Sequence, residues 1–313
     1  MIEVRELSRS YGALRAVHQV SFDIDRGEIV GLLGHNGAGK TTIMKMLTGY
    51  LEPSSGRIRI EGVDVAEQRR RAQRRIGYLP ENCPLYPEMR VLDYLDYHAA
   101  LHGMPSGRRA GAIRRAIERT ELGPKATSTI GTLSRGYRQR VGVAQAILHE
   151  PAILILDEPT NGLDPSQIQH MRGLVRELSY GATLIISTHV LQEVEAVCSR
   201  VLIMRGGELA LDSALDAIGR PRRLLVTLDR PPETARPVLT AIDGVNAVEE
   251  WTVDGGKHCF ALGAAEPQAI GPSVARAVAE NGWDLYGLAP ERRDLEDLFG
   301  AVTLEQMEEV AHG

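Results

Sequence analysis

Cysteine is scarce in this sequence, and the three thiols lie far apart. Cys83, Cys198 and Cys259 have no second cysteine or histidine at the spacing that a disulfide framework or a zinc site requires. An odd number of cysteines is also a poor basis for complete disulfide pairing. We therefore expect reduced thiols, as in proteins of the cytosol.

Long apolar runs are absent as well. No stretch reaches the roughly 18 apolar residues of a membrane-spanning helix. The first residues, MIEVRELSRSYGALR, carry charges where a signal peptide has its apolar core. The sequence therefore predicts a cytoplasmic protein, held to a membrane only if another subunit binds it there.

Basic charge is not in excess. The chain has 36 basic and 41 acidic residues and a formal net charge of −5, so it has no general attraction to nucleic acid or to an anionic membrane surface. The run RRRAQRR at 69–75 and the arginines from 108 to 119 lack interleaved aromatic residues for base stacking. We therefore expect no nucleic-acid partner.

The overall composition of the chain is that of an ordinary globular protein. Its 313 residues are 43% hydrophobic and 25% charged, which is enough for one large domain and a smaller one. Disordered and fibrous classes are therefore excluded.

A glycine-rich loop between a short apolar strand and a helix is the strongest local signal. Within residues 28–49, the letters GHNGAGKT match the pattern G-x-x-x-x-G-K-[ST]. Such a loop turns backbone N–H groups onto the β- and γ-phosphates of a nucleotide, Lys40 adds a positive charge, and the Thr41 hydroxyl binds Mg²⁺. The predicted nucleotide contacts are Gly34, His35, Asn36, Gly37, Ala38, Gly39, Lys40, Thr41 and Thr42.

Two further buried strands end in ionisable residues. Residues 152–156 lead into Asp157 and Glu158, and open α/β sheets bind their ligands at such carboxyl ends. We expect Asp157 to hold Mg²⁺ through water and Glu158 to polarise the attacking water. The strand ATLIISTHV ends in His189, which we expect to contact the γ-phosphate. These features together indicate a P-loop NTPase.

A second anion site is predicted at LSRGYRQRVGVAQAIL, residues 133–148. Ser134 and Gly136 lie in a turn that leads into helical spacing, and a helix N-terminus attracts anions. The chain's own phosphate loop already surrounds its nucleotide, so this turn needs a second nucleotide as its target. The economical source is another copy of the chain, which predicts a homodimer formed through the ATP sites.

These residues resemble the ATP-binding-cassette (ABC) ATPases over residues 1 to about 215, with six motifs in the family's order. LSRGY is similar to the LSGGQ signature and departs from it at Arg135 and Tyr137. The resemblance implies that Tyr11 stacks on adenine with Val17 beside it. It also implies that Asp164, in NGLDP, faces the opposite nucleotide site.

The sixth motif, IGYLPE, ends in Glu81 where most of the family has glutamine. The resemblance assigns this residue to Mg²⁺ or to the attacking water. A glutamate keeps the oxygen but lacks the amide donor, and its charge near the phosphates predicts weaker nucleotide affinity without metal. With LSRGYRQR, the stretch YLPENCPLYPEM resembles the branch paired with ABC-2-type exporters, which includes gliding-motility and drug-efflux ATPases.

The implied fold is an α/β ABC-type P-loop NTPase core over 1–218, with a helical subdomain at about 84–150. A linker at 219–223 then leads to a small C-terminal α+β domain, 224–313. Its patterns suggest the order β-α-β-β-α-β, the ferredoxin-like arrangement. A ligand-sensing role and a structural or dimer-stabilising role are both open for this domain.

The implied function is the ATP-hydrolysing subunit of an ABC-2-type exporter. Two copies would enclose two ATP–Mg²⁺ and drive a separate membrane permease from the inner face of the plasma membrane. We expect docking near Pro84, Tyr86 and Met89, with Tyr86 and Met89 on the surface and Leu92 packed inside the helical subdomain.

Two alternatives differ in partner. One is a soluble ABC ATPase acting on the ribosome or DNA, but the chain has a single cassette and no long coiled-coil insertion. The other is an importer ATPase, which the YLPE and LSRGY spellings disfavour. The transported substrate is left open.

Overall fold

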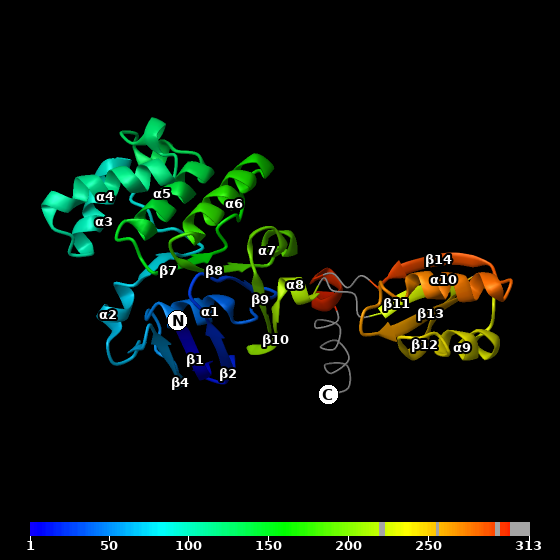
Figure 1. Ribbon diagram of the computed structural model, residues 1–313. Helices are drawn as coiled ribbons and strands as arrows, with labels where there is room; N and C mark the ends of the chain where they lie inside the picture. The colour runs from blue at the N-terminus through cyan, green and yellow to red at the C-terminus, as the bar shows by residue number, and fades with distance from the viewer. Residues whose placement is uncertain (219–222, 255–256, 292–294, 301–313) are drawn as a thin grey trace. The chain divides into compact units, whose positions relative to one another are not determined.

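The computed structural model describes residues 1–218, 223–254, 257–291 and 295–300. Their fold divides into two compact units, Met1–Leu215 and Asp216–Gly300 (Figure 1). The predicted linker, 219–223, lies outside the described residues except for Arg223, the first residue of β11. Each unit is therefore described by itself.

A six-stranded sheet forms the centre of the first unit, in the order β10-β9-β3-β8-β7-β6. Neighbouring strands from β9 to β6 run parallel, and only β10 is antiparallel to its neighbour. Every residue of β7 and β8 is buried, as expected for parallel strands covered on both faces. The strands are β3 (Ile29–Leu33), β6 (Ile76–Leu79), β7 (Ile153–Asp157), β8 (Thr183–Thr188), β9 (Arg200–Arg205) and β10 (Glu208–Ala214).

A second, antiparallel sheet in this unit has the order β2-β1-β4-β5. One hydrophobic core joins it to helix α1 and to one side of the large sheet, through residues such as Ile2, Ile43 and Ile155. The elements are β1 (Ile2–Tyr11), β2 (Leu14–Ile24), α1 (Lys40–Leu47), β4 (Ser55–Ile60), β5 (Val63–Asp64) and α2 (Arg69–Gln73).

Three helices lie between β6 and β7, in the range predicted for a helical subdomain, and they share a second core with the sheet that includes Tyr94, Val141 and Leu156. In Figure 1, α3, α4 and α5 gather on the side of the large sheet opposite α1. The helices between β6 and β7 are α3 (Val91–Leu101), α4 (Ser106–Arg119) and α5 (Arg135–Ile147), with 3-10 turns at Gly123–Lys125 and Ile130–Thr132. Helix α6 (Pro165–Ser179) follows β7, α7 (Leu191–Val197) follows β8, and α8 (Leu215–Ile218) lies where the two units meet in the sequence.

The second unit is a four-stranded antiparallel sheet in the order β12-β13-β11-β14. Its described elements follow one another as β-α-β-β-α-β, and Val226, Phe260 and Val274 lie in their shared core. The elements are β11 (Arg223–Leu228), α9 (Pro232–Thr240), β12 (Val245–Asp254), β13 (Lys257–Ala264), α10 (Gly271–Glu280) and β14 (Leu285–Pro290).

The expected surface of the docking segment needs a correction. Tyr86 is exposed as predicted, but Met89 is half-buried against the helical core, and its carbonyl accepts the Ile130 N–H at 2.9 Å. Leu92, predicted to be inside, is exposed. The reason is where the helix begins: α3 starts at Val91, and its period turns Val91 and Leu95 inward and Leu92 outward.

Three half-buried histidines lie between the helical subdomain and β6. The rings of His102 and His149 stack with centroids 4.0 Å apart, and His149 Nε2 lies 3.0 Å from the carbonyl oxygen of Ile76. Burial lowers the pKa of His98, His102 and His149, and it lowers the pKa of His149 to about 4. The neutral imidazole of His149 therefore joins the two parts of the unit.

We expect this unit to lose stability in mild acid. The pKa of His149 is lower in the fold than in the unfolded chain, so its contribution is present above about pH 6.5 and is lost as the pH falls toward about 4. Each pKa unit is worth about 1.4 kcal/mol, so the loss approaches roughly 3 kcal/mol. Urea unfolding at pH 7 and pH 5 should show about 2 kcal/mol of this loss, because about 1.5 pH units lie between pH 6.5 and pH 5. His149→Gln should flatten the pH dependence and His170→Gln, on an exposed site of α6, should not; equal slopes in all three proteins would contradict this.

Candidate functional site

The glycine-rich loop joins the end of β3 to the start of α1. Gly37 and Gly39 have φ of 85° and 104°, a region that favours glycine. A Cβ on Gly39 would lie 2.6 Å from the carbonyl oxygen of Ala16, so only glycine fits there. Val17 packs beneath the loop and is almost fully buried. This packing places Lys40 at the first position of the helix.

Lys40 is 6% exposed and turns its ammonium back into the loop. Its Nζ donates to the carbonyls of Gly34 at 2.6 Å and His35 at 3.3 Å, and it lies 4.0 Å from a Glu158 carboxylate oxygen. Burial lowers the pKa of Lys40, while nearby carboxylates, Glu158 first, oppose this effect. A cation held in this loop is suited to bind phosphate oxygens.

Asp157 ends β7 beside the loop and is 1% exposed. One carboxylate oxygen accepts the Ser187 hydroxyl, and the other, Oδ2, is buried without a partner. Burial raises the pKa of Asp157, while hydrogen bonds from Ser187 and, more weakly, Thr41 lower it. An unpartnered buried carboxylate oxygen near a hydroxyl fits Mg²⁺, which takes oxygen ligands.

Protein side chains alone do not complete a metal site. Across residues 1–218 and the other described ranges, no group of three or more His, Cys, Asp or Glu side chains could hold a metal ion. A magnesium ion at Asp157 and Thr41 would therefore take its remaining ligands from phosphate oxygens and water.

Glu158 and His189 form a pair at the neighbouring strand ends. Glu158 is 7% exposed and has a positive φ of 49°, which is uncommon for a residue with a side chain. The Nδ1 of His189 lies 2.9 and 3.0 Å from the two carboxylate oxygens of Glu158. The imidazole is about half exposed, so the pair has one buried member and one that faces solvent. This is a geometry suited to proton transfer.

Glu81 reaches the same edge of the sheet from the segment after β6. The Asn161 side-chain amide donates to its Oε1 at 3.5 Å, and its charge acts on both Lys40 and Asp157. Tyr11, at the end of β1, is 46% exposed and has the Arg9 guanidinium 4.9 Å from its ring centroid. Its ring is therefore available to stack.

The predicted second anion site packs against a neighbouring turn of the same chain. Ser134 is the N-cap of α5 and accepts the Tyr137 N–H at 3.4 Å. Asp164 is the N-cap of α6 and accepts the Gln167 N–H at 2.9 Å. A Cβ on Gly136 would lie 2.7 Å from the Gln167 side chain, so glycine lets the two caps approach closely.

Several polar contacts in this site were not predicted from the sequence. Ser187 binds Asp157, and Thr160 and Thr188 both bind a buried carboxylate, Glu193. An acidic residue inside the helical pattern after THV looks like surface charge, so the sequence carried no signal for Glu193. The serine and threonines lie within or directly after the strands already identified, but nothing local marks them as partners.

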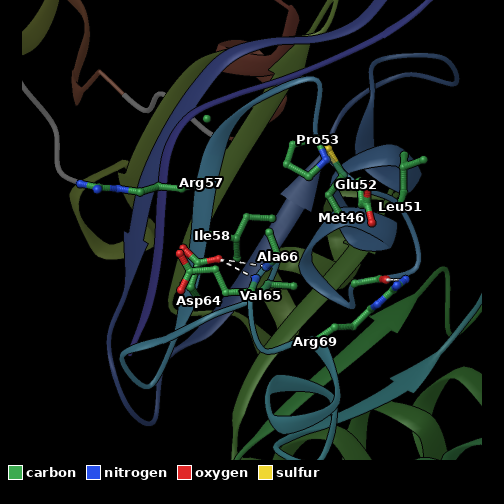
Figure 2. Close-up of a pocket in the computed structure, with 13 residues that line it drawn as sticks. Met46, Leu51, Glu52, Pro53, Arg57, Ile58, Asp64, Val65, Ala66 and Arg69 are labelled. Carbon is green, nitrogen blue, oxygen red and sulfur yellow. Dashed lines mark hydrogen bonds between the residues drawn. The ribbon is translucent and has the colours of Figure 1, made fainter.

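A separate hollow lies between the end of α1 and strands β4 and β5. It has a volume of about 190 Å³, and Figure 2 shows its walls, which include Met46, Ile58 and Val65. Asp64 and Arg69 lie at its rim and are bonded to backbone groups. None of the predicted nucleotide-site residues lines it.

Comparison with known proteins agrees with this geometry. The family model described as ABC transporter matches residues 17–161. The chain is 32% identical to the ABC transporter ATP-binding protein YdbJ of Bacillus subtilis over 99% of this chain and 97% of the relative. It is 36% identical to the bacitracin transport ATP-binding protein BcrA of Bacillus licheniformis, with 96% of each chain covered. A solved ATP-binding subunit of an ABC transporter is 33% identical, with a TM-score of 0.64, over 70% of this chain and 91% of that one.

Proposed function

The chain belongs to the ABC transporter family as an ATP-binding subunit with ATPase activity, and from this premise we propose that it drives a separate membrane permease of the ABC-2 exporter type. The observation that carries the proposal is the meeting of Lys40, Asp157, Glu158 and His189 at one edge of the sheet.

The nucleotide and its magnesium ion would bind at this edge. The loop amides and Lys40 would hold the phosphates, Thr41 and Asp157 would hold Mg²⁺, and Tyr11 would stack on the base. Mg²⁺ supplies charge neutralisation at the phosphates when bound. Glu158 would accept the proton of the attacking water. His189 would orient Glu158 through Nδ1 and would contact the γ-phosphate.

Two copies would complete the sites. Ser134 and Asp164 cap two helices that start side by side, so the N-terminal amides of both helices and the Asp164 carboxylate share one surface. In the proposed homodimer this surface meets the γ-phosphate bound by the other copy.

A groove in the first unit is suited to receive the permease. It has a volume of about 1030 Å³ and separates the nucleotide-binding core from the helical subdomain, with the exposed Tyr50 and Leu101 on its walls and Pro84 at its edge. Lys45, Arg70 and Arg74 also line it, and its lining has no aspartate or glutamate among the residues that the structure describes. We expect an apolar helix with acidic side chains to dock there.

No helix among the described residues is long and apolar enough to cross a bilayer. We propose that the permease would hold the protein at the inner face of the plasma membrane. A gene for a six-span permease beside the gene of this chain would support export. A partner on the ribosome or DNA would instead favour a soluble ABC ATPase.

The docking surface is tested by removing two exposed tyrosines. Tyr50 lines the groove, and Tyr86 lies beside it, with its ring centroid 6.0 Å from that of the groove residue Tyr94. Tyr50→Ala and Tyr86→Ala should reduce co-purification with the neighbouring permease by about tenfold or more, as expected for aromatic anchors of an interface. Basal ATPase activity should stay within about twofold, because neither ring contacts the phosphate loop.

Tyr180→Ala is the matched control, since Tyr180 is also exposed but lies at the end of α6. Normal co-purification of both the Tyr50 and the Tyr86 variants would place docking elsewhere on the surface.

A further inference from the structure

A buried glutamate that belongs to no predicted motif joins the two loops of the hydrolysis site. Glu193 is 6% exposed and lies in the first turn of α7. Its Oε2 accepts the Thr160 hydroxyl at 2.5 Å and the Thr188 hydroxyl at 3.3 Å. Thr160 follows Glu158 by two residues, and Thr188 directly precedes His189.

Both threonines are fixed within the turns that carry the reacting side chains. The Leu163 N–H donates to the Thr160 carbonyl at 3.1 Å, and the Asn161 N–H to the Glu158 carbonyl at 3.1 Å. The Val190 N–H donates to the Thr188 hydroxyl at 3.1 Å, and that hydroxyl donates to Glu193. The residue before His189 is therefore bonded to the residue after it and to α7. A change at either hydroxyl therefore reaches the backbone of Glu158 or His189.

The helix that carries Glu193 is itself anchored to the sheet. Val194 lies so close to Gly31 of β3 that a Cβ there would be 2.9 Å from Val194 Cγ1. Arg172 and Arg176 of α6 donate to the carbonyls of Gln192 and Ala196. Glu193 therefore extends from a fixed platform, while Glu158 holds a backbone conformation uncommon for its type.

We infer that Glu193 is a positioning residue for ATP hydrolysis, which holds Glu158 and His189 in register through Thr160 and Thr188. The inference rests on the proposed roles of Glu158 and His189. The Glu193 carboxylate accepts two hydrogen bonds at once, one from each threonine hydroxyl. One buried charge therefore binds both loops. A small displacement of a reacting group is enough to slow a reaction by about 100-fold.

The test removes each hydroxyl while keeping side-chain volume. Thr160→Val and Thr188→Val should each lower kcat about 10- to 100-fold and leave KM for ATP within about twofold, because the phosphate contacts are unchanged. Thr160→Ser and Thr188→Ser keep the hydroxyl and should stay within about twofold of the wild-type kcat. Thr120→Val is the matched control, since its hydroxyl is also buried but binds the Ala116 carbonyl in α4.

A double-mutant cycle separates positioning from a structural effect. In the Glu158→Gln background, Thr160→Val should cost less than about twofold in residual turnover, because its effect acts through Glu158. A full additional loss, or normal kcat in both valine variants, would overturn the inference. Glu193→Met, which keeps a side chain of similar length but removes both acceptor oxygens, is the independent variant if a valine variant does not fold, and it should also lower kcat about 10- to 100-fold. Wild-type turnover of Glu158→Gln would instead overturn the proposed site itself.

Discussion

Glu158→Gln is expected to lower the turnover of ATP by about 10²- to 10⁴-fold, roughly 3 to 5 kcal/mol of transition-state stabilisation. An amide in place of the carboxylate cannot accept the proton of water, although it fits the same nearly buried space. The phosphate contacts of Lys40 and of the loop amides remain. ATP should therefore still bind, and an ATP-loaded dimer should accumulate.

Steady-state kinetics and size-exclusion chromatography with ATP measure both effects. Glu195→Gln is the matched control, because Glu195 lies on the exposed side of α7 and carries the same charge. Wild-type turnover in Glu158→Gln would show that Glu158 does not accept the proton of the attacking water.

Features coded by neighbouring residues were predictable from the sequence. The phosphate loop has its glycines, Lys40 and Thr41 within a few positions, and the backbone geometry there depends on those glycines. The apolar run before Asp157 predicted a buried parallel strand, and β7 is buried throughout. Ser134 and Asp164 cap helices as their side chains favour.

Features that depend on packing between distant segments were not predictable. Glu193 meets Thr160 across 33 positions, and only the arrangement of β7, β8 and α7 brings them together. Leu92 is exposed because of the residue at which α3 starts, and Met89 is half-buried because the chain before α3 packs against the helical core and bonds to Ile130. Arg135 replaces a small residue of the family signature, and its guanidinium lies against Gly162, where a Cβ would be 2.5 Å from its central carbon. Such contacts follow from the fold and not from local pattern.

The shared-site model makes a prediction about mixed dimers. Lys40→Ala damages the site that its own chain surrounds, whereas Ser134→Arg places bulk and charge where the other copy's phosphate is expected. Each variant alone should lose most of its activity, by about 100-fold or more. In a mixed dimer one site carries both changes and the other carries neither. With equal amounts and free exchange, half of the dimers are mixed, so about a quarter of wild-type activity should return if each site works independently.

The decisive comparison is a mixture in which both changes lie on the same side of the site. Lys40 and Glu158 of one chain act on one nucleotide, because their side chains lie 4.0 Å apart. Mixing Lys40→Ala with Glu158→Gln therefore leaves every site damaged, and no activity should return. If the Ser134→Arg mixture regains no more activity than this control, the Ser134 turn gains no support as part of the partner's site. Full activity of Ser134→Arg alone would exclude the turn from both sites. Recovery in the first mixture and not in the second has one simple explanation, since it requires the turn before α5 to act on the nucleotide of the other chain.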